Sequence, residues 1–227
     1  MEFTFKIGEK IKEAWVLYKE HFSTLLIITL ATFAIQFVGQ KDNPVLGFLV
    51  LVVSFFLSYV WIRLIFSILD KKEHNLFSKE ALPTLVQFWN FIKTSILLAL
   101  CVLAGFILFV IPGFYVLGRL VFSSYISVEK NQGGRASIKE AWGMTKGFGW
   151  KLFWKSFLIG LFMLLGIIAF FVGSIITYPV GFMIMIMMYR EFVKFKSQIP
   201  ASPAPFEVVK DLPKETSIET IVKEEVK

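Results

Sequence analysis

Residues 45–69 read VLGFLVLVVSFFLSYVWIRLIFSIL, an unbroken apolar run with one charged side chain, Arg63. An α-helix rises about 1.5 Å per residue and the hydrocarbon core of a bilayer is about 30 Å thick, so this run is long enough to cross a membrane. The composition agrees, because 56% of the 227 residues are hydrophobic and only 18% are charged. Soluble domains keep about a quarter of their residues charged. The chain is therefore predicted to be a membrane protein, and the composition excludes an ordinary soluble globule and a disordered regulator.

Five more apolar segments accompany this run, at residues 22–39, 94–111, 113–128, 152–173 and 180–195. Short turn-forming connectors at 40–44, 112–113 and 174–179 are expected to close the six segments into three helical hairpins. After residue 196 the chain is rich in Pro, Glu and Lys, a composition typical of disorder. The sequence thus predicts an all-α polytopic bundle of six transmembrane helices in residues 1–196 and a disordered cytoplasmic tail in residues 197–227.

The distribution of positive charge predicts the orientation of the spans. Lys and Arg gather before the first span, in the two long loops and after the sixth span, whereas the hairpin connectors hold one cation, Lys41. By the positive-inside rule, both termini and both long loops are expected in the cytoplasm. The chain carries a net charge of +7, and the cytoplasmic leaflet is anionic. The expected partners are therefore membrane lipids, anionic ones above all, and the tail is a candidate surface for a cytoplasmic protein partner.

Two motifs recur along the chain and predict an internal repeat. Residues 11–15 and 138–142 both read IKEAW, and residues 78–82 read SKEAL; an amphipathic stretch and a hairpin follow each. Residues 59–67 read YVWIRLIFS and residues 115–123 read YVLGRLVFS, while Arg190 takes the arginine position in the third hairpin. We predict three parallel repeats, about 1–72, 73–130 and 131–196, each an interfacial amphipathic helix plus a helical hairpin.

The amphipathic helices are expected to begin at definable residues and to carry interfacial tryptophans. Ser137 and Glu140 have the spacing of a capping box, and Pro83 is expected to delay the second helix. Indole rings favour headgroup depth, and the predicted interfacial anchors are Trp15, Trp89, Trp142, Trp150 and Trp154. Two interpretations stay open: these helices brace the bundle from the interface, or they recognise anionic lipid or a cytoplasmic partner.

The arginines inside the spans are the candidate binding groups. Tyr, Arg and Ser recur at i, i+4 and i+8, so each trio forms a polar stripe on one helix face; the trios are Tyr59, Arg63 and Ser67, and Tyr115, Arg119 and Ser123. In one interpretation these arginines snorkel to the headgroups. In the other, the two stripes turn inward and, with Arg190 nearer the cytoplasm, form a cationic cavity for phosphate or carboxylate. The acids Asp70, Glu129 and Glu191 lie at span ends, so no internal neutralisation of these arginines is expected.

Residue patterns for other chemistries are absent from the sequence. His21, His74 and the single Cys101 form no metal-ligand cluster, and no phosphate-binding or dinucleotide-binding motif occurs. The basic and aromatic residues follow the membrane interface, which argues against nucleic acid. The glycines at 105, 160, 166 and 173 are expected to allow close helix packing. We therefore predict no catalytic residue, no metal and no cofactor.

One stretch of the chain resembles a known family. Its pattern is an Ile-Pro-Gly turn, an arginine-bearing span, a Val-x-Glu exit, an Ala and Trp in the next helix and a Thr-Lys-Gly turn; the residues are Ile111, Pro112, Gly113, Arg119, Val128, Glu129, Ala136, Trp142, Thr145, Lys146 and Gly147. Over about residues 105–155 this resembles the glycerophosphoryl diester phosphodiesterase membrane-domain family and related six-span prokaryotic proteins. The resemblance implies a bacterial or archaeal cytoplasmic (inner) membrane protein that handles or senses lipid-derived phosphoesters. In some relatives a phosphodiesterase is fused to this domain; residues 1–227 contain none, so that activity is not expected of them.

Together these features predict a non-enzymatic, lipid-interacting scaffold or accessory domain of the membrane. One alternative is a transporter or permease for an amphipathic or anionic solute, moving through a cavity lined by Arg63 and Arg119. Another is a membrane anchor whose tail recruits a soluble partner.

Overall fold

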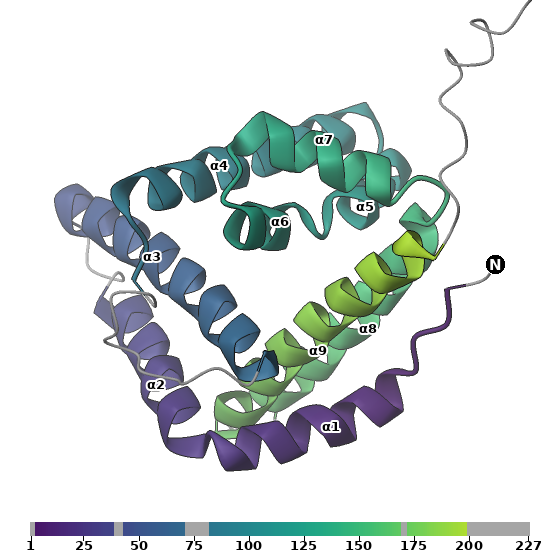
Figure 1. Ribbon diagram of the computed structural model, residues 1–227. Coiled ribbons are helices and arrows are strands. Elements are labelled where there is room, and N and C mark those ends of the chain that lie inside the picture. Colours follow the sequence, from purple (N-terminus) through teal and green to yellow (C-terminus); the bar gives the residue numbers. More distant parts are fainter. Residues whose placement is uncertain (1–2, 39–42, 71–81, 169–171, 199–227) are drawn as a thin grey trace, which may run out of the picture.

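The computed structural model describes residues 3–38, 43–70, 82–168 and 172–198, which form nine helices and no strand (Figure 1). The helices are α1 (Ile7–Glu20), α2 (Phe22–Val38), α3 (Pro44–Leu69), α4 (Leu85–Leu108), α5 (Val110–Leu120), α6 (Ser123–Lys130), α7 (Gly134–Met144), α8 (Gly149–Ile168) and α9 (Val172–Ser197). Five stretches of this part are long and apolar enough to cross a membrane: Pro44–Leu69, Leu85–Leu108, Val110–Lys130, Gly149–Gly166 and Gly173–Ser197. The first predicted span corresponds to α2, whose apolar part, Phe22–Gln36, is shorter. The all-α class is thus confirmed, and five helical stretches are long and apolar enough to be membrane spans, where six spans were predicted.

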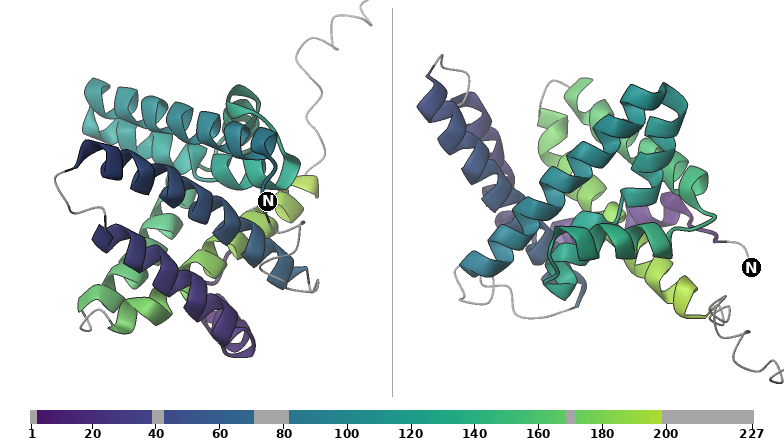
Figure 2. Two further views of the ribbon diagram at one scale, coloured as in Figure 1. Left: turned by 90° about the vertical axis from the view of Figure 1, so that its left-hand side faces the viewer. Right: turned by 90° about the horizontal axis from the view of Figure 1, so that it is seen from above.

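Three helical pairs build the molecule. Helix α2 lies along α3, α4 along α5 and α6, and α8 along α9. In Figure 1, α3, α4 and α9 outline a triangle, with α7 beside α4 at the top and α1 at the bottom, below the corner where α3 and α9 meet. The two other views show the chain running up one helix of each pair and back down the next (Figure 2). We call α3, the α5–α6 segment and α9 the returning helices, because each is the second member of its pair.

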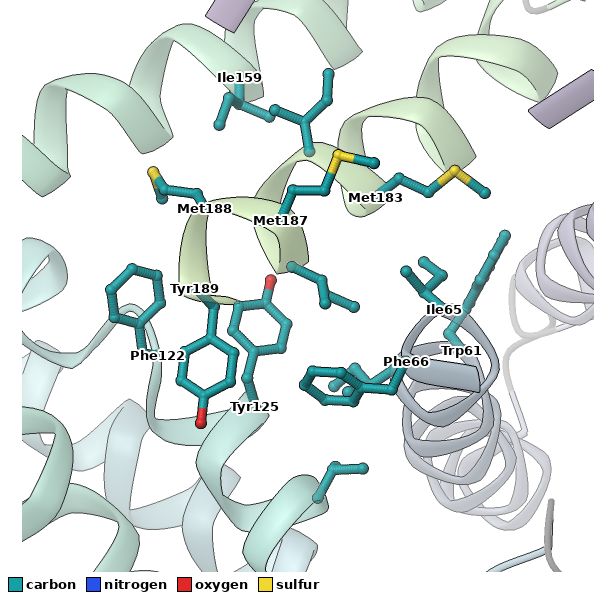
Figure 3. Close-up of a cluster of buried hydrophobic side chains, with 14 of the residues drawn as sticks. Trp61, Ile65, Phe66, Phe122, Tyr125, Ile159, Met183, Met187, Met188 and Tyr189 are labelled. Atoms are coloured by element: carbon teal, nitrogen blue, oxygen red, sulfur yellow. The ribbon is translucent and has the colours of Figure 1, made fainter. Parts of the chain in front are cut away.

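The core lies where the returning helices meet. Phe66 of α3 points toward Tyr125 of α6 and Tyr189 of α9 (Figure 3), and Trp61 of α3 stacks on Phe182 of α9 with the ring centroids 6.1 Å apart. Outside this region the pairs separate and their apolar side chains are exposed: Val45 at the start of α3 is 68% exposed, and Phe109 between α4 and α5 is 75% exposed. A soluble protein rarely exposes apolar patches of this extent, whereas in a bilayer they contact lipid tails.

The amphipathic segments of the three predicted repeats differ in structure. Helices α1 and α7 are separate amphipathic helices, as predicted, but the second stretch is continuous with its span in α4. Pro83 does delay that helix, which begins at Leu85 with a capping box between Thr84 and Gln87. The predicted capping box of Ser137 and Glu140 is wrong, because α7 begins one turn earlier. A Cβ at Gly134 would lie 2.9 Å from the Lys93 carbonyl oxygen, so the absence of a side chain there lets the start of α7 approach α4.

Two of the predicted connectors lie inside helices. Residues 174–179 belong to α9, which begins at Val172 and contains Pro179. Membrane helices tolerate an internal proline because neighbouring groups satisfy the freed backbone. Residues 112–113 fall in the first turn of α5, where proline loses no helical hydrogen bond, and the α4–α5 turn is made by Phe109 in an extended conformation. The predicted span 113–128 is interrupted at residues 121–122, between α5 and α6.

The predicted repeat boundaries at about 72, 130 and 196 are not tested by these helices and stay predictions. Residues 39–42, 71–81, 169–171 and 199–227 lie outside the described part of the chain. These segments contain Lys41, His74, the SKEAL motif except Leu82, and nearly all of the predicted tail.

Candidate functional site

The buried arginine of the second pair, Arg119, closes the end of a neighbouring helix. Its side chain is 4% exposed, and one terminal nitrogen, Nη2, donates a hydrogen bond to the carbonyl oxygen of Trp142. The last carbonyls of a helix lack partners within the helix and form the negative end of its dipole. Trp142 lies in the last turn of α7, so the guanidinium supplies both a donor and a positive charge there. The guanidinium carbon also lies 4.3 Å from the centroid of the Trp142 ring, a cation–π contact.

The approach of Arg119 to α7 depends on two glycines. A Cβ at Gly118 would lie 2.8 Å from the Cβ of Phe153 and still closer to the carbonyl oxygen of Gly149. A Cβ at Gly149 would lie 2.7 Å from the Tyr115 ring and 3.0 Å from Cδ of Arg119. Helices α5 and α8 therefore cross backbone to backbone. The Thr145 hydroxyl adds a bond of 2.7 Å to the Arg119 carbonyl oxygen across the same junction.

The arginine of the first pair, Arg63, occupies a comparable junction between α3 and α4. It is half-buried, and its Nη1 donates to the Tyr59 hydroxyl at 3.2 Å. That hydroxyl donates in turn to Oε1 of Gln87 at 3.4 Å, and the same oxygen accepts the Thr84 backbone N–H at 3.1 Å. Arg63 is thereby linked to the group that caps α4. Within the described residues no carboxylate contacts it.

The predicted Tyr–Arg pairing is confirmed in both trios, because Arg119 Nη1 also donates to the Tyr115 hydroxyl, at 3.4 Å. The serines do not extend the stripes. Ser123 is buried and donates to the Leu120 carbonyl oxygen at 2.8 Å, at the break between α5 and α6. Ser67 is half-buried, and in the described part no hydrogen bond joins it to Arg63. Arg63 is linked to α4 through Tyr59, whereas Arg119 bonds directly to α7, so the structure does not bring the two arginines into contact with a common partner.

Arg190, the third arginine, is neutralised within the protein, contrary to expectation. Its guanidinium lies 3.0 Å from Asp70 and 3.5 Å from Glu129, and it stacks over the Phe66 ring at 4.8 Å. These acids end α3 and α6, whereas Arg190 is near the end of α9. The fold brings the three helix ends together and turns carboxylates at span ends into ion-pair partners. Sequence position alone showed the acids at span ends, but it could not show that the ends meet.

A second ion pair joins α9 to the amphipathic helix α1. Glu191 lies 2.6 Å from Nζ of Lys10, and Glu13 lies 2.7 Å from the same nitrogen. Burial lowers the pKa of Lys10, but the hydrogen bonds and charges of Glu13 and Glu191 outweigh burial, so that its pKa lies above the ordinary value of 10.5. Helix α1 is therefore held against the third pair by charge as well as by its apolar face.

The predicted interfacial tryptophans all reach the surface. Their side chains are between 38% and 57% exposed: Trp15, Trp89, Trp142, Trp150 and Trp154. Two carry a lysine one helical turn later over the ring, Lys19 at 5.3 Å from Trp15 and Lys93 at 5.5 Å from Trp89. The sixth tryptophan, Trp61, is buried in the core. Amphipathic aromatic side chains with a neighbouring cation are typical of the membrane–water boundary.

Sequence reasoning missed a cavity of about 400 Å³ between α2, α8 and α9. Gly160, expected to permit close packing, lines this cavity, and a Cβ there would meet nothing within 4 Å. The expectation holds at Gly105 and Gly166, where a Cβ would lie 3.1 Å from Gly113 and 2.9 Å from Gly173. The one sequence signal for the cavity is Gln36, an amide near the end of an otherwise apolar helix.

Within the described residues no group of three His, Cys, Asp or Glu side chains could hold a metal ion. No protein-family model, curated protein or solved structure matches the chain.

Proposed function

We propose that the protein is a non-enzymatic, lipid-interacting scaffold of a prokaryotic cytoplasmic membrane, with six spans in three parallel repeats and both termini in the cytoplasm. The observation that carries this proposal is the set of exposed tryptophans beside cations at the starts of the apolar helices. Trp15 and Lys19 precede α2, Trp89 and Lys93 begin α4, and Trp150 begins α8. Indole and ammonium groups at one depth fit the headgroup layer, and the positive charge favours anionic lipid.

The arginine contacts favour a scaffold over a conduit for anions. Arg119 is used to close α7 and Arg190 to join the ends of α3, α6 and α9. A guanidinium that is already paired inside the protein gains less from an anionic solute, because it must give up its partner first. Arg63 is the best candidate for a headgroup phosphate, since it is half-buried and, within the described residues, its Nη1 donates to a neutral hydroxyl and not to a carboxylate. The resemblance to a family that handles lipid-derived phosphoesters agrees with this assignment.

The transporter alternative has one observation in its favour, the cavity between α2, α8 and α9. Its lining contains no charged side chain. Transfer of an anion through an uncharged, largely apolar space is costly, so the cavity supports transport of an anionic solute poorly. An apolar or amphipathic occupant suits it better.

Lipid retention by purified protein tests the scaffold proposal. The full chain is reconstituted in vesicles of phosphatidylcholine and phosphatidylglycerol and then extracted. Native mass spectrometry identifies and quantifies the lipids that stay bound to it. We expect retained lipid enriched in phosphatidylglycerol over the vesicle composition, and an enrichment reduced by Arg63→Gln and by Trp89→Ala. Gly47→Ala, a change on the lipid-facing part of α3 with nothing within 4 Å of the new Cβ, is the matched control. Retention that mirrors the vesicle composition in the unmodified chain would contradict the proposal.

A further inference from the structure

The cavity between α2, α8 and α9 is partly open, and Gly160 and Leu164 of its lining are exposed at the surface of the molecule. Its volume of about 400 Å³ falls in the range of small-molecule sites, roughly 300–1,000 Å³. The wall from α8 includes Gly160, Met163 and Leu164. Leu161 and Leu165 on the same helix are 44% and 55% exposed, so the surroundings of the opening are apolar as well. In a bilayer, the molecules that reach such an opening are lipids.

The cavity also has polar groups at one end. Gln36 of α2 and Tyr178 and Ser174 of α9 belong to its lining; Gln36 lies near the end of α2, and Ser174 lies near the start of α9, one turn before Tyr178. Within the described residues, neither the Gln36 amide nor the Tyr178 hydroxyl makes a hydrogen bond. The Thr32 hydroxyl, by contrast, is used, since it donates to the Ile28 carbonyl oxygen at 2.7 Å. Polar groups left without partners in hydrocarbon are costly, so these two favour a ligand that offers hydrogen-bonding atoms.

The ring of Tyr178 is held in place by its neighbours. It lies 6.2 Å from Phe33 across the cavity, 6.0 Å from Trp61 of the core and 5.2 Å from Phe182. Aromatic contacts on several sides fix the ring, and with it the direction of the hydroxyl. The site is thus preformed, as ligand sites usually are.

From this arrangement we infer that the cavity binds one acyl chain of a membrane glycerolipid, with the ester region of that lipid at Gln36 and Tyr178. The chain fills the apolar space beside Gly160, and the ester oxygens accept hydrogen bonds from the amide and the hydroxyl. Given the predicted orientation, the lipid belongs to the leaflet away from the cytoplasm. The inference deepens the proposed lipid interaction and rests on the protein being in a bilayer, but it does not rest on the charge of the headgroup.

Photolabelling in vesicles tests the inference. The full chain is reconstituted in phosphatidylcholine vesicles that contain a phosphatidylcholine with a photoreactive diazirine on one acyl chain, and the labelled peptides are identified by mass spectrometry. We expect labelling of residues 32–36 and 160–164 to exceed, several-fold, the labelling of the freely exposed stretch 100–108 of α4. Equal labelling of the cavity stretches and of 100–108 would overturn the inference.

Two variants sharpen the result. Gly160→Phe fills the cavity without meeting backbone, and Gly47→Phe places the same ring in open space on α3 outside it. The excess labelling should disappear in the first and persist in the second; an excess that survives Gly160→Phe contradicts the inference. Should Gly160→Phe fail to fold, Gln36→Leu is the second test, and it must lower the excess. These vesicles contain no anionic lipid, so failure of the phosphatidylglycerol enrichment leaves this result standing, and loss of the cavity labelling leaves the enrichment standing.

Discussion

A side chain at position 118 should weaken the junction of α5, α7 and α8. In Gly118→Ala the new Cβ would lie 2.8 Å from Cβ of Phe153 and 3.0 Å from the Gly149 carbonyl carbon. Carbon atoms in contact are normally about 3.5–4.0 Å apart, so α8 must retreat by roughly 1 Å. Overpacking of this kind costs about 1–3 kcal/mol. Because Gly149 also contacts Arg119, the movement is expected to lengthen the bond from Arg119 to Trp142, and loss of a charged hydrogen bond adds about 1.5–3 kcal/mol.

Thermal unfolding of the purified protein in detergent measures this effect. We expect the midpoint of Gly118→Ala to fall clearly below that of the unmodified chain. The matched control is Gly47→Ala, also inside a long apolar helix, where the new Cβ meets nothing within 4 Å; it should be unchanged or slightly more stable, since alanine favours a helix by about 0.5–1 kcal/mol. Equal midpoints for the two variants would refute the argument that α5 and α8 cross backbone to backbone at this point.

Three further predictions follow from the polar contacts. Arg119→Leu should lower the unfolding midpoint by more than Arg119→Lys, because the Trp142 carbonyl then loses its only side-chain donor in the described part; similar losses would argue against the cap. Thr84→Ala should cost about 1 kcal/mol at the start of α4, measured by the same unfolding assay, with no change meaning that the capping box contributes nothing. The pKa of Lys10 is raised in the folded protein, so its ion pair with Glu191 stabilises the fold fully below pH 10.5, and this stabilisation is lost as the pH rises through the higher pKa of the folded state. Above pH 10.5 the unmodified chain should therefore lose stability more steeply than Lys10→Met. Parallel curves of stability against pH for the two proteins would contradict this prediction.

Contacts within one helix were predictable from the sequence, whereas contacts between helices were not. Tyr59 and Arg63 are one turn apart, so their bond follows from the helical period alone. The partner of Arg119 is a backbone carbonyl on α7, and reaching it requires the close crossing at Gly118 and Gly149. Backbone carbonyls carry no sequence signature. An arginine in an apolar span therefore predicts a polar contact without predicting its partner.

The sequence likewise predicted the presence of the helices better than it predicted the residues at which they begin and end. The apolar runs predicted the long helices correctly, because crossing a bilayer requires a helix of sufficient apolar length, whatever the order of its residues. The prediction of a turn at residues 174–179 was wrong because Pro179 lies within α9. Membrane helices tolerate an internal proline, since neighbouring groups satisfy the backbone hydrogen-bonding groups that it frees. The predicted capping box at Ser137 was wrong because Gly134 allows α7 to begin one turn earlier, in close contact with α4. The cavity could not be predicted, since Gly160 has the same local sequence features as the glycines that do permit close packing.

The polar contacts link each helical pair to the amphipathic segment of another, and this has a consequence for the repeat. Arg63 reaches the cap of α4 through Tyr59, Arg119 reaches the end of α7, and Glu191 reaches Lys10 of α1. The returning helix of each predicted repeat thus contacts the amphipathic segment of the next, and the third contacts the first. Such a closed cycle requires the three returning helices to end on the same side of the molecule. The ion pairs of Arg190 with Asp70 and Glu129 place those ends together, as the prediction of three parallel repeats requires.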